Sequence, residues 1–183
     1  LQAGKAPLRL EWQPIEEVIG ASIQVVSQSL RANPVRVALS PDLPLVAIDA
    51  VLMERVLCNL LENAAKFSPP GEEVSVVALP EDTTLVVDVS DRGPGIPEEE
   101  RRRVFDLFYS TARGDRGARG GGLGLTIVRG MIGAHGGRVE ALCEGPDLPL
   151  GPSWAPAGQV GRDRGVHRRA LVGSQVGALA GHD

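Results

Sequence analysis

In this chain of 183 residues, residues 59–67 read Asn-Leu-Leu-Glu-Asn-Ala-Ala-Lys-Phe, within a longer helical pattern. Asn59 and Asn63 are four residues apart and Lys66 follows three residues later, so the three side chains share one face of the helix. The pattern predicts a helix that buries an apolar face and presents two amides and one ammonium group. The apolar positions at helical spacing are Leu52, Val56, Leu57, Leu60, Leu61 and Ala64.

The polar face of this helix suits a complex of a metal ion with phosphate. Amide oxygen is a hard ligand that suits Mg²⁺, and a lysine ammonium offers a point charge to phosphate. Surface helices are polar on one side in any case. A solvated face without a ligand is therefore the alternative for this segment taken alone.

The segments around this helix mix strands with helices. They follow no strict βαβ alternation, which predicts an α+β fold with helices on one face of a sheet. Asp49 is placed to cap the central helix. The other expected elements are a strand at 8–12, a helix opened by Pro14, a strand at 35–39, a hairpin of 74–79 with 85–89, a short helix at 98–105, a helix at 125–132 and a strand at 138–142.

A second polar segment, residues 91–97, reads Asp-Arg-Gly-Pro-Gly-Ile-Pro directly after an apolar strand. Asp91 at the strand end can accept a hydrogen bond from a purine amino group. Glycines at 93 and 95 would let the backbone approach a flat base closely. Asp, Gly and Pro also favour ordinary turns for local reasons, so a plain turn is the alternative.

The third segment is the run Val-Phe-Asp-Leu-Phe at 104–108. Aromatic residues make up only 3% of the chain, and two of its three phenylalanines, Phe105 and Phe108, lie in this run. Core packing is the simplest interpretation. We expect both rings to anchor the segment that follows.

The fourth segment, residues 120–125, reads Gly-Gly-Gly-Leu-Gly-Leu and leads into a helix. A glycine-rich backbone before a helix N-terminus presents N–H groups and a positive dipole to phosphate. The segment lacks the spacing of a dinucleotide fingerprint and the Lys-Ser/Thr of a P-loop. A flexible linker is the alternative for the glycines taken alone.

The order and spacing of these four segments resemble the histidine-kinase branch of the GHKL ATPases, over residues 8–142. Residues 59–67 resemble its N box, 91–95 its G1 box, 104–108 its F box and 120–125 its G2 box. The amino-acid sequences of residues 54–66 and 130–137 are most similar to those of potassium-responsive KdpD-type sensor kinases.

The resemblance implies a two-layer α/β sandwich that holds ATP and Mg²⁺ between the N-box helix and a lid at 109–119. Asn63 and Asn59 would hold the metal, and Glu62 and Lys66 would complete the catalytic group. The residues implied in nucleotide binding are Asn63, Lys66, Phe67, Asp91, Gly93, Gly95, Ile96, Gly120, Gly121, Gly122, Leu123, Gly124 and Leu125.

The activity implied is transfer of the γ-phosphoryl group of ATP to a histidine on a dimerisation domain. No histidine precedes His135, so that acceptor segment is missing, and His135 is expected to be a structural turn residue. Gyrase- and chaperone-type ATPases carry a water-activating glutamate where Asn59 stands, and an amide is no such base. The alternatives are a GHKL-type ATPase or serine kinase, or a non-catalytic nucleotide-binding or interaction module.

Residues 143–183 depart from the family, which continues with one more strand that closes the sheet. Gly, Ala, Pro and Arg predominate there, and apolar residues lose both periods. We expect residues 1–142 to form the ATP-binding domain and 143–183 to form a disordered tail.

Net charge and cysteine content indicate which partners and which cellular compartment to expect for the protein. The net charge of −4 argues against a general nucleic-acid partner. The two cysteines lack metal-ligand spacing, which fits a reduced cytoplasmic compartment. We expect no membrane contact from this part of the kinase, and we expect a response regulator and the dimerisation domain as partners.

Overall fold

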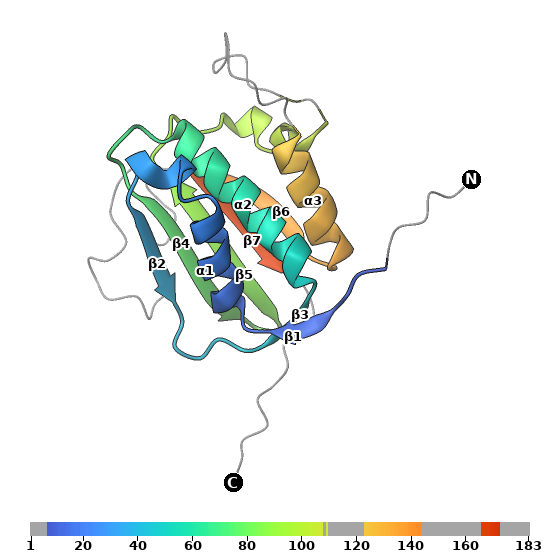
Figure 1. Ribbon diagram of the computed structural model, residues 1–183. Coiled ribbons are helices and arrows are strands. Elements are labelled where there is room, and N and C mark those ends of the chain that lie inside the picture. The colour runs from blue at the N-terminus through green and yellow to red at the C-terminus, as the bar shows by residue number, and fades with distance from the viewer. Residues whose placement is uncertain (1–6, 108, 110–122, 144–165, 173–183) are drawn as a thin grey trace.

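The computed structural model describes residues 7–107, 109, 123–143 and 166–172. Helices α1, α2 and α3 lie side by side on one face of a five-stranded sheet, with α2 between the other two (Figure 1). The elements in chain order are β1 (Glu11–Gln13), α1 (Ile15–Val25), the 3-10 turn η1 (Ser29–Ala32), β2 (Val35–Leu39), β3 (Val46–Ile48), α2 (Ala50–Phe67), β4 (Val74–Glu81), β5 (Thr84–Asp91), the 3-10 turns η2 (Glu98–Glu100) and η3 (Arg103–Phe105), α3 (Gly124–Ala134), β6 (Arg138–Cys143) and β7 (Val166–Val172).

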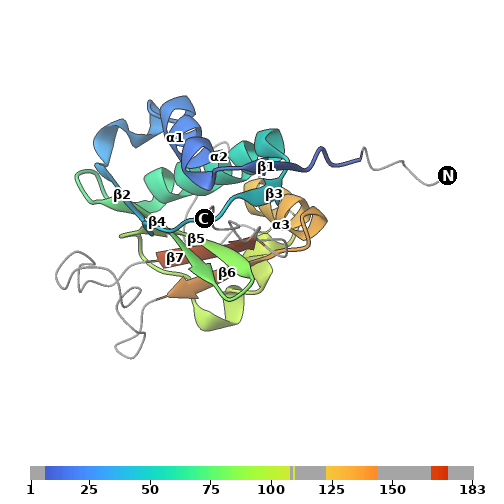
Figure 2. The same cartoon turned by 90° about the horizontal axis from the view of Figure 1, so that it is seen from below.

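The main sheet has the strand order β2-β4-β5-β7-β6. β2 runs parallel to β4, and every other neighbouring pair in this sheet is antiparallel. β1 and β3 form a separate antiparallel ribbon at the edge of the helical layer. Seen from below, the helices form one layer and the sheet the other (Figure 2). The expected α+β sandwich, a mixed sheet with helices on one face, is confirmed.

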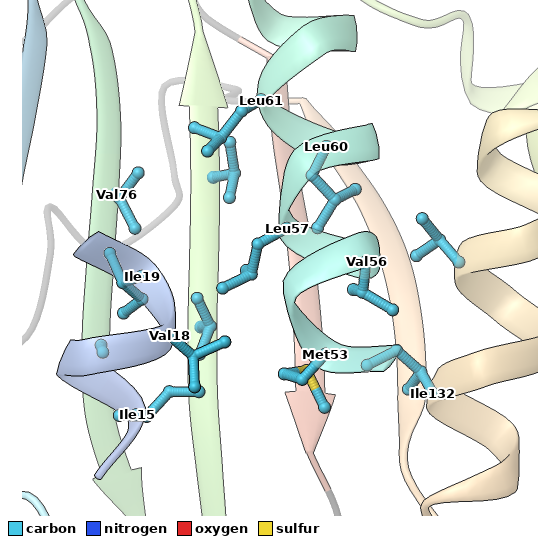
Figure 3. Close-up of a cluster of buried hydrophobic side chains, with 14 of the residues drawn as sticks. Ile15, Val18, Ile19, Met53, Val56, Leu57, Leu60, Leu61, Val76 and Ile132 are labelled. Atoms are coloured by element: carbon cyan, nitrogen blue, oxygen red, sulfur yellow. The ribbon is translucent and has the colours of Figure 1, made fainter. Parts of the chain in front are cut away.

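Helix α2 forms where the sequence predicts it, because its start is capped and its apolar stripe is buried. The N–H of Leu52 donates to Oδ1 of Asp49 over 3.2 Å, as expected for an N-cap. Every predicted stripe residue except the half-buried Leu52 lies in the core, together with Met53. Ile15 and Ile19 of α1 lie on one side of this stripe and Ile132 of α3 on the other (Figure 3). Each such buried side chain contributes about 1.5–3 kcal/mol.

Strands β4 and β5 form the predicted hairpin and carry Asp91 to the end of the sheet. They pair antiparallel from Ser75 opposite Ser90 to Glu81 opposite Thr84. The turn lies at Asp82, whose φ of 50° is in the left-handed region that aspartate tolerates. The alternating burial of β4 is typical of a strand with one face on a core.

The expectation of no strand within residues 143–183 is wrong for β7. This strand pairs antiparallel with β5 on one side and β6 on the other. The main sheet therefore includes residues beyond 142, up to Val172. β7 reads Val-His-Arg-Arg-Ala-Leu-Val, and the three polar residues break the apolar alternation by which a central strand is recognised. The remainder of the expected disordered tail, 144–165 and 173–183, lies outside the described residues.

Two further local expectations change. Strand β3 was not predicted, because it has only three residues and lies in the short stretch between Pro44 and the helix cap at Asp49. The single short helix expected at 98–105 is instead the pair of 3-10 turns η2 and η3. Runs of three acidic and three basic residues at 98–103 give no apolar stripe for an α-helix to bury.

His135 is a structural residue, as the sequence predicts. It ends α3 and is buried, with an exposed fraction of 7%. Its Nε2 accepts a hydrogen bond from the N–H of Asp49 over 3.1 Å, and its Nδ1 lies 2.7 Å from the carbonyl oxygen of Met131. These contacts tie the end of α3 to the start of α2.

No helix in the described part of the chain is long and apolar enough to cross a membrane.

Candidate nucleotide-binding site

Three of the four sequence segments meet at one end of the molecule. The C-terminal half of α2, the loop after β5 and the start of α3 lie together at the top of Figure 1. The segments are far apart in sequence, and the contacts between their residues define two parts of a site. We call the part formed by Asn59, Asn63, Lys66 and Gly124 the amide end, and the part formed by Phe67, Ser68, Asp91 and Gly93 the carboxylate end.

The amide end forms where α3 approaches α2. A Cβ atom added to Gly124 would lie 3.1 Å from Oδ1 of Asn59 and 3.7 Å from Nδ2 of Asn63. The Nδ2 group of Asn59 donates to the carbonyl oxygen of Arg55 over 2.8 Å, which turns the Oδ1 atom toward Gly124. A side chain at 124 would crowd the two amides, so the glycine keeps space beside the Oδ1 of Asn59 and the Nδ2 of Asn63. Amide oxygen is a ligand type that Mg²⁺ accepts, and the Oδ1 of Asn59 is the one that faces this space.

The next turn of α2 continues the polar face. The Lys66 ammonium lies 5.2 Å from the ring centroid of Phe67. Lys66 and Glu62 are exposed, and Asn63 and Phe67 are half-buried. The helix therefore brings together the four residues expected in the catalytic group, Asn59, Glu62, Asn63 and Lys66, within two turns.

The carboxylate end is built from backbone around one buried acid. Asp91 ends β5 with an exposed fraction of 2%. Its Oδ1 accepts a hydrogen bond from the N–H of Gly93 over 2.8 Å. A Cβ atom at Gly93 would lie 2.6 Å from that oxygen and 3.0 Å from the carbonyl oxygen of Phe67, so only glycine fits there. A buried carboxylate held this tightly can recognise a donor group in one fixed direction.

Two other expected residues shape the same loop. Gly95 has a φ of 86°, a conformation in which other residues are strained. Ile96 is buried and packs with Val104, Phe105 and Ala141 in a small second core. The loop after Asp91 is therefore anchored by apolar packing at its far end.

Ser68 belongs to the carboxylate end and was not predicted to do so. The residue caps the C-terminus of α2, and its Oγ accepts a hydrogen bond from the N–H of Arg92 over 3.1 Å. It is buried, with an exposed fraction of 7%. In the sequence, Ser68 precedes two prolines and only marks the end of a helix. Its partner lies 24 residues away, so no local pattern could have found this bond.

Phe105 is buried and packs against Leu125 at the start of α3, as expected for a core residue, while most of the segment that it was expected to anchor lies outside the described residues. Phe108 lies outside the described residues. After η3, Oδ1 of Asp106 is paired with Nη1 of Arg129 on α3 at 3.1 Å. The Arg103 guanidinium stacks over the Tyr109 ring at 4.9 Å. Burial, together with the hydrogen bond that the Tyr109 hydroxyl donates to the Glu100 carboxylate, raises the pKa of that hydroxyl.

The glycine-rich segment is described only in part. Residues 110–122, which include Gly120, Gly121 and Gly122 and most of the expected lid, lie outside the described residues. Leu123 is exposed and precedes the first turn of α3. Leu125 is half-buried and packs against both apolar clusters. The start of α3 is thus fixed by packing beside the amide end.

A buried strand-end aspartate facing glycine backbone, next to a helix bearing two amides, is the arrangement of an ATP-binding domain. The chain belongs to the family described as histidine kinase-, DNA gyrase B-, and HSP90-like ATPase, whose model matches residues 48–164. This match confirms the family and the fold class expected from the sequence.

Within this family the chain is similar to sensor histidine kinases. It is 39% identical to the sensor protein KdpD of Escherichia coli (strain K12) over 143 residues, which are 77% of this chain and 16% of KdpD. It matches a solved structure of the mycobacterial sensor histidine kinase MprB with a TM-score of 0.70 and 30% identity, over 89% of this chain and 96% of that one.

A second solved structure, full-length ShkA in complex with AMPPNP, matches with a TM-score of 0.75 and 26% identity, over 97% of this chain and 34% of that one. The matched region of KdpD is about one sixth of that protein's length. The chain is therefore an ATP-binding domain of the type found in sensor histidine kinases.

Proposed function

We propose that this chain binds Mg²⁺-ATP and transfers its γ-phosphoryl group to a histidine on a dimerisation domain of the same kinase. The observation that carries the proposal is the amide at position 59. Asn59 lies beside Gly124 on the polar face of α2, where the ATPases of the family place a water-activating glutamate. An amide cannot take a proton from water as a carboxylate does. This difference favours transfer to a protein nucleophile over hydrolysis.

The two ends of the site have separate tasks in this proposal. Asp91 accepts a hydrogen bond from the amino group of adenine, while the backbone of Gly93 and Gly95 lines the base. Asn63, with Asn59, holds Mg²⁺, which neutralises phosphate charge when bound. Lys66 contacts phosphate and Glu62 lies within the same polar face. Gly120, Gly121, Gly122, Leu123, Gly124 and Leu125 complete the phosphate-binding side.

The transfer itself needs little covalent work from this domain. A nitrogen of the acceptor imidazole forms a bond to the γ-phosphorus as the bond from that phosphorus to the β,γ-bridging oxygen breaks, and ADP leaves. The residues of this chain supply positioning and charge neutralisation. The phosphoryl group then passes to a response regulator. This partner and the cytoplasmic location are proposed from the similarity to sensor kinases such as KdpD.

The test supplies the missing acceptor. The chain is incubated with γ-labelled ATP, alone and with the isolated dimerisation domain of a KdpD-type kinase. We expect label on the added domain only, and slow transfer, because tethering raises the local concentration of partners to roughly millimolar and is missing here. Label on the isolated chain would contradict the proposal. Rapid release of phosphate without an acceptor would favour an ATPase.

A further inference from the structure

Asn33 is a buried polar residue outside the expected site, and both of its side-chain donor hydrogens are used. It follows η1 and has an exposed fraction of 5%. Its Nδ2 donates to the carbonyl oxygen of Pro69 over 2.7 Å and to that of Glu72 over 2.9 Å. These partners lie 36 and 39 residues further along the chain. A side-chain amide offers two N–H donors from one nitrogen without carrying a charge.

The hydrogen bonds of Asn33 fix the loop that leaves α2. The N–H of Gly71 in the same loop donates to the carbonyl oxygen of Ala32 over 2.7 Å. Gly71 has a φ of 89°, so the loop takes a path that other residues resist. Residues 69–72 are therefore held to η1 at three points.

This loop begins directly after the carboxylate end. Ser68 accepts from the N–H of Arg92, which couples the end of α2 to the segment that follows Asp91. The carbonyl oxygen of Phe67 faces Gly93 at the distance where a Cβ atom would collide. A shift of residues 68–69 would thus move two groups near the Asp91 carboxylate, the Phe67 carbonyl and the Ser68 hydroxyl. The two amides of the amide end, Asn63 and Asn59, lie one to three turns earlier on α2, and only Lys66 is next to this loop.

We infer that Asn33 is a positioning residue for base recognition. It acts through the 69–72 loop and Ser68 to hold Asp91 and Gly93 in the geometry that selects adenine. The inference rests on the proposed function, since it assumes that the carboxylate end takes the base. The inference predicts that loss of Asn33 weakens base selectivity but not phosphate binding. A residue with a purely structural role would weaken both together.

The test measures the dissociation constants of the 183-residue chain for ATP, GTP and inorganic tripolyphosphate, each with Mg²⁺, by displacement of a fluorescent ATP analogue. In Asn33→Ala we expect the preference for ATP over GTP to fall about tenfold. This factor corresponds to the loss of one hydrogen bond, the one proposed between Asp91 and the base. The affinity for tripolyphosphate should stay within about twofold. The matched control is Ser22→Ala on α1, which removes a buried hydroxyl that donates to the carbonyl oxygen of Val18 over 2.7 Å and lies 3.5 Å from that of Glu54, both outside the loop. It should leave the preference unchanged.

A milder variant keeps the inference testable if Asn33→Ala does not fold. Gly71→Ala adds a Cβ atom that meets nothing within 4 Å, so it strains the loop only through its φ. We expect a smaller loss of the same preference. An unchanged ATP preference in these variants would overturn the role of Asn33, and so would an equal loss of tripolyphosphate affinity. A wild-type chain that binds ATP and GTP equally would instead overturn the proposed base site itself.

Discussion

The two ends of the site are built in opposite ways. Asp91 and Ser68 at the carboxylate end are buried and held by backbone hydrogen bonds. Asn59 and Asn63 at the amide end are half-exposed, and Lys66 is exposed. Buried polar groups whose partners are fixed by the fold can discriminate between ligands by geometry. Exposed amides and ammonium groups can instead supply ligands and charge without a cost to the fold. We therefore expect base selectivity and phosphate binding to be separable in this domain.

The largest effect should come from removing β7, which supports both ends at once. A chain that stops after residue 165 loses the strand that pairs with both β5 and β6. We expect it to lose cooperative thermal unfolding, as followed by circular dichroism, because two strands are left with unpaired backbone groups. A chain that stops after residue 172 keeps every described element and is the control. A chain ending at 165 that melts like the full chain would show that β7 is dispensable.

Gly93→Ala should distort the carboxylate end of the site and leave the amide end unchanged. The added Cβ atom would collide with Oδ1 of Asp91 at 2.6 Å and with the carbonyl oxygen of Phe67 at 3.0 Å. We expect a loss of about 1–3 kcal/mol in the free energy of unfolding, together with loss of the ATP preference. Urea unfolding and nucleotide displacement measure the two effects. Gly20→Ala is the control, since its Cβ atom meets nothing within 4 Å and alanine within a helix stabilises by about 0.5–1 kcal/mol. Equal behaviour of the two variants would contradict the close packing around Asp91.

The smallest effect concerns Asp49, which caps α2 at the end remote from the site. Burial would raise its pKa, but backbone hydrogen bonds from Arg9 and Leu52 outweigh this and lower it. A lowered pKa stabilises the fold above the unfolded value of about 3.9, and this contribution is lost as the pH falls through the folded value. Asp49→Asn should cost about 1 kcal/mol or less at pH 7.

Urea unfolding at two pH values tests the role of this cap. The difference in stability between wild type and Asp49→Asn should shrink at about pH 3, where the wild-type carboxyl is protonated in the unfolded state. Base preference and tripolyphosphate affinity should not change in Asp49→Asn, because Asp49 caps the N-terminus of α2 and the site residues of α2 lie in its C-terminal half. A difference that grows on acidification would contradict the direction of the pKa shift.

The sequence predicts those parts of the fold whose signals are local. The stripe of α2, the cap at Asp49 and the β4–β5 hairpin follow from periodicity and turn residues within short windows. The amide end was predictable for the same reason, since Asn59, Asn63 and Lys66 share one helix. Gly93 was predicted from its motif, and the structure adds the collision that requires it.

Features that depend on distant partners could not be predicted. β7 has no apolar alternation, and only backbone pairing with β5 and β6 places it in the sheet. Asn33 precedes a proline and indicates nothing more than a chain break, yet its hydrogen bonds reach Pro69 and Glu72. Ser68 is likewise defined by a partner 24 residues away. Long-range hydrogen bonds of this kind leave no period in the sequence.

The separation of the two ends is tested most directly by comparing Asn63→Ala with Asp91→Ala in one set of titrations. The dissociation constants for ATP and GTP are measured with and without Mg²⁺, with circular dichroism to verify the fold. We expect Asn63→Ala to abolish the Mg²⁺-dependent part of binding while any remaining affinity still favours ATP. Asp91→Ala should bind ATP and GTP equally and keep its Mg²⁺ dependence. If both variants lose the same property, or if Asn63→Ala binds Mg²⁺-ATP like wild type, the division into a carboxylate end for the base and an amide end for the metal and phosphates is wrong.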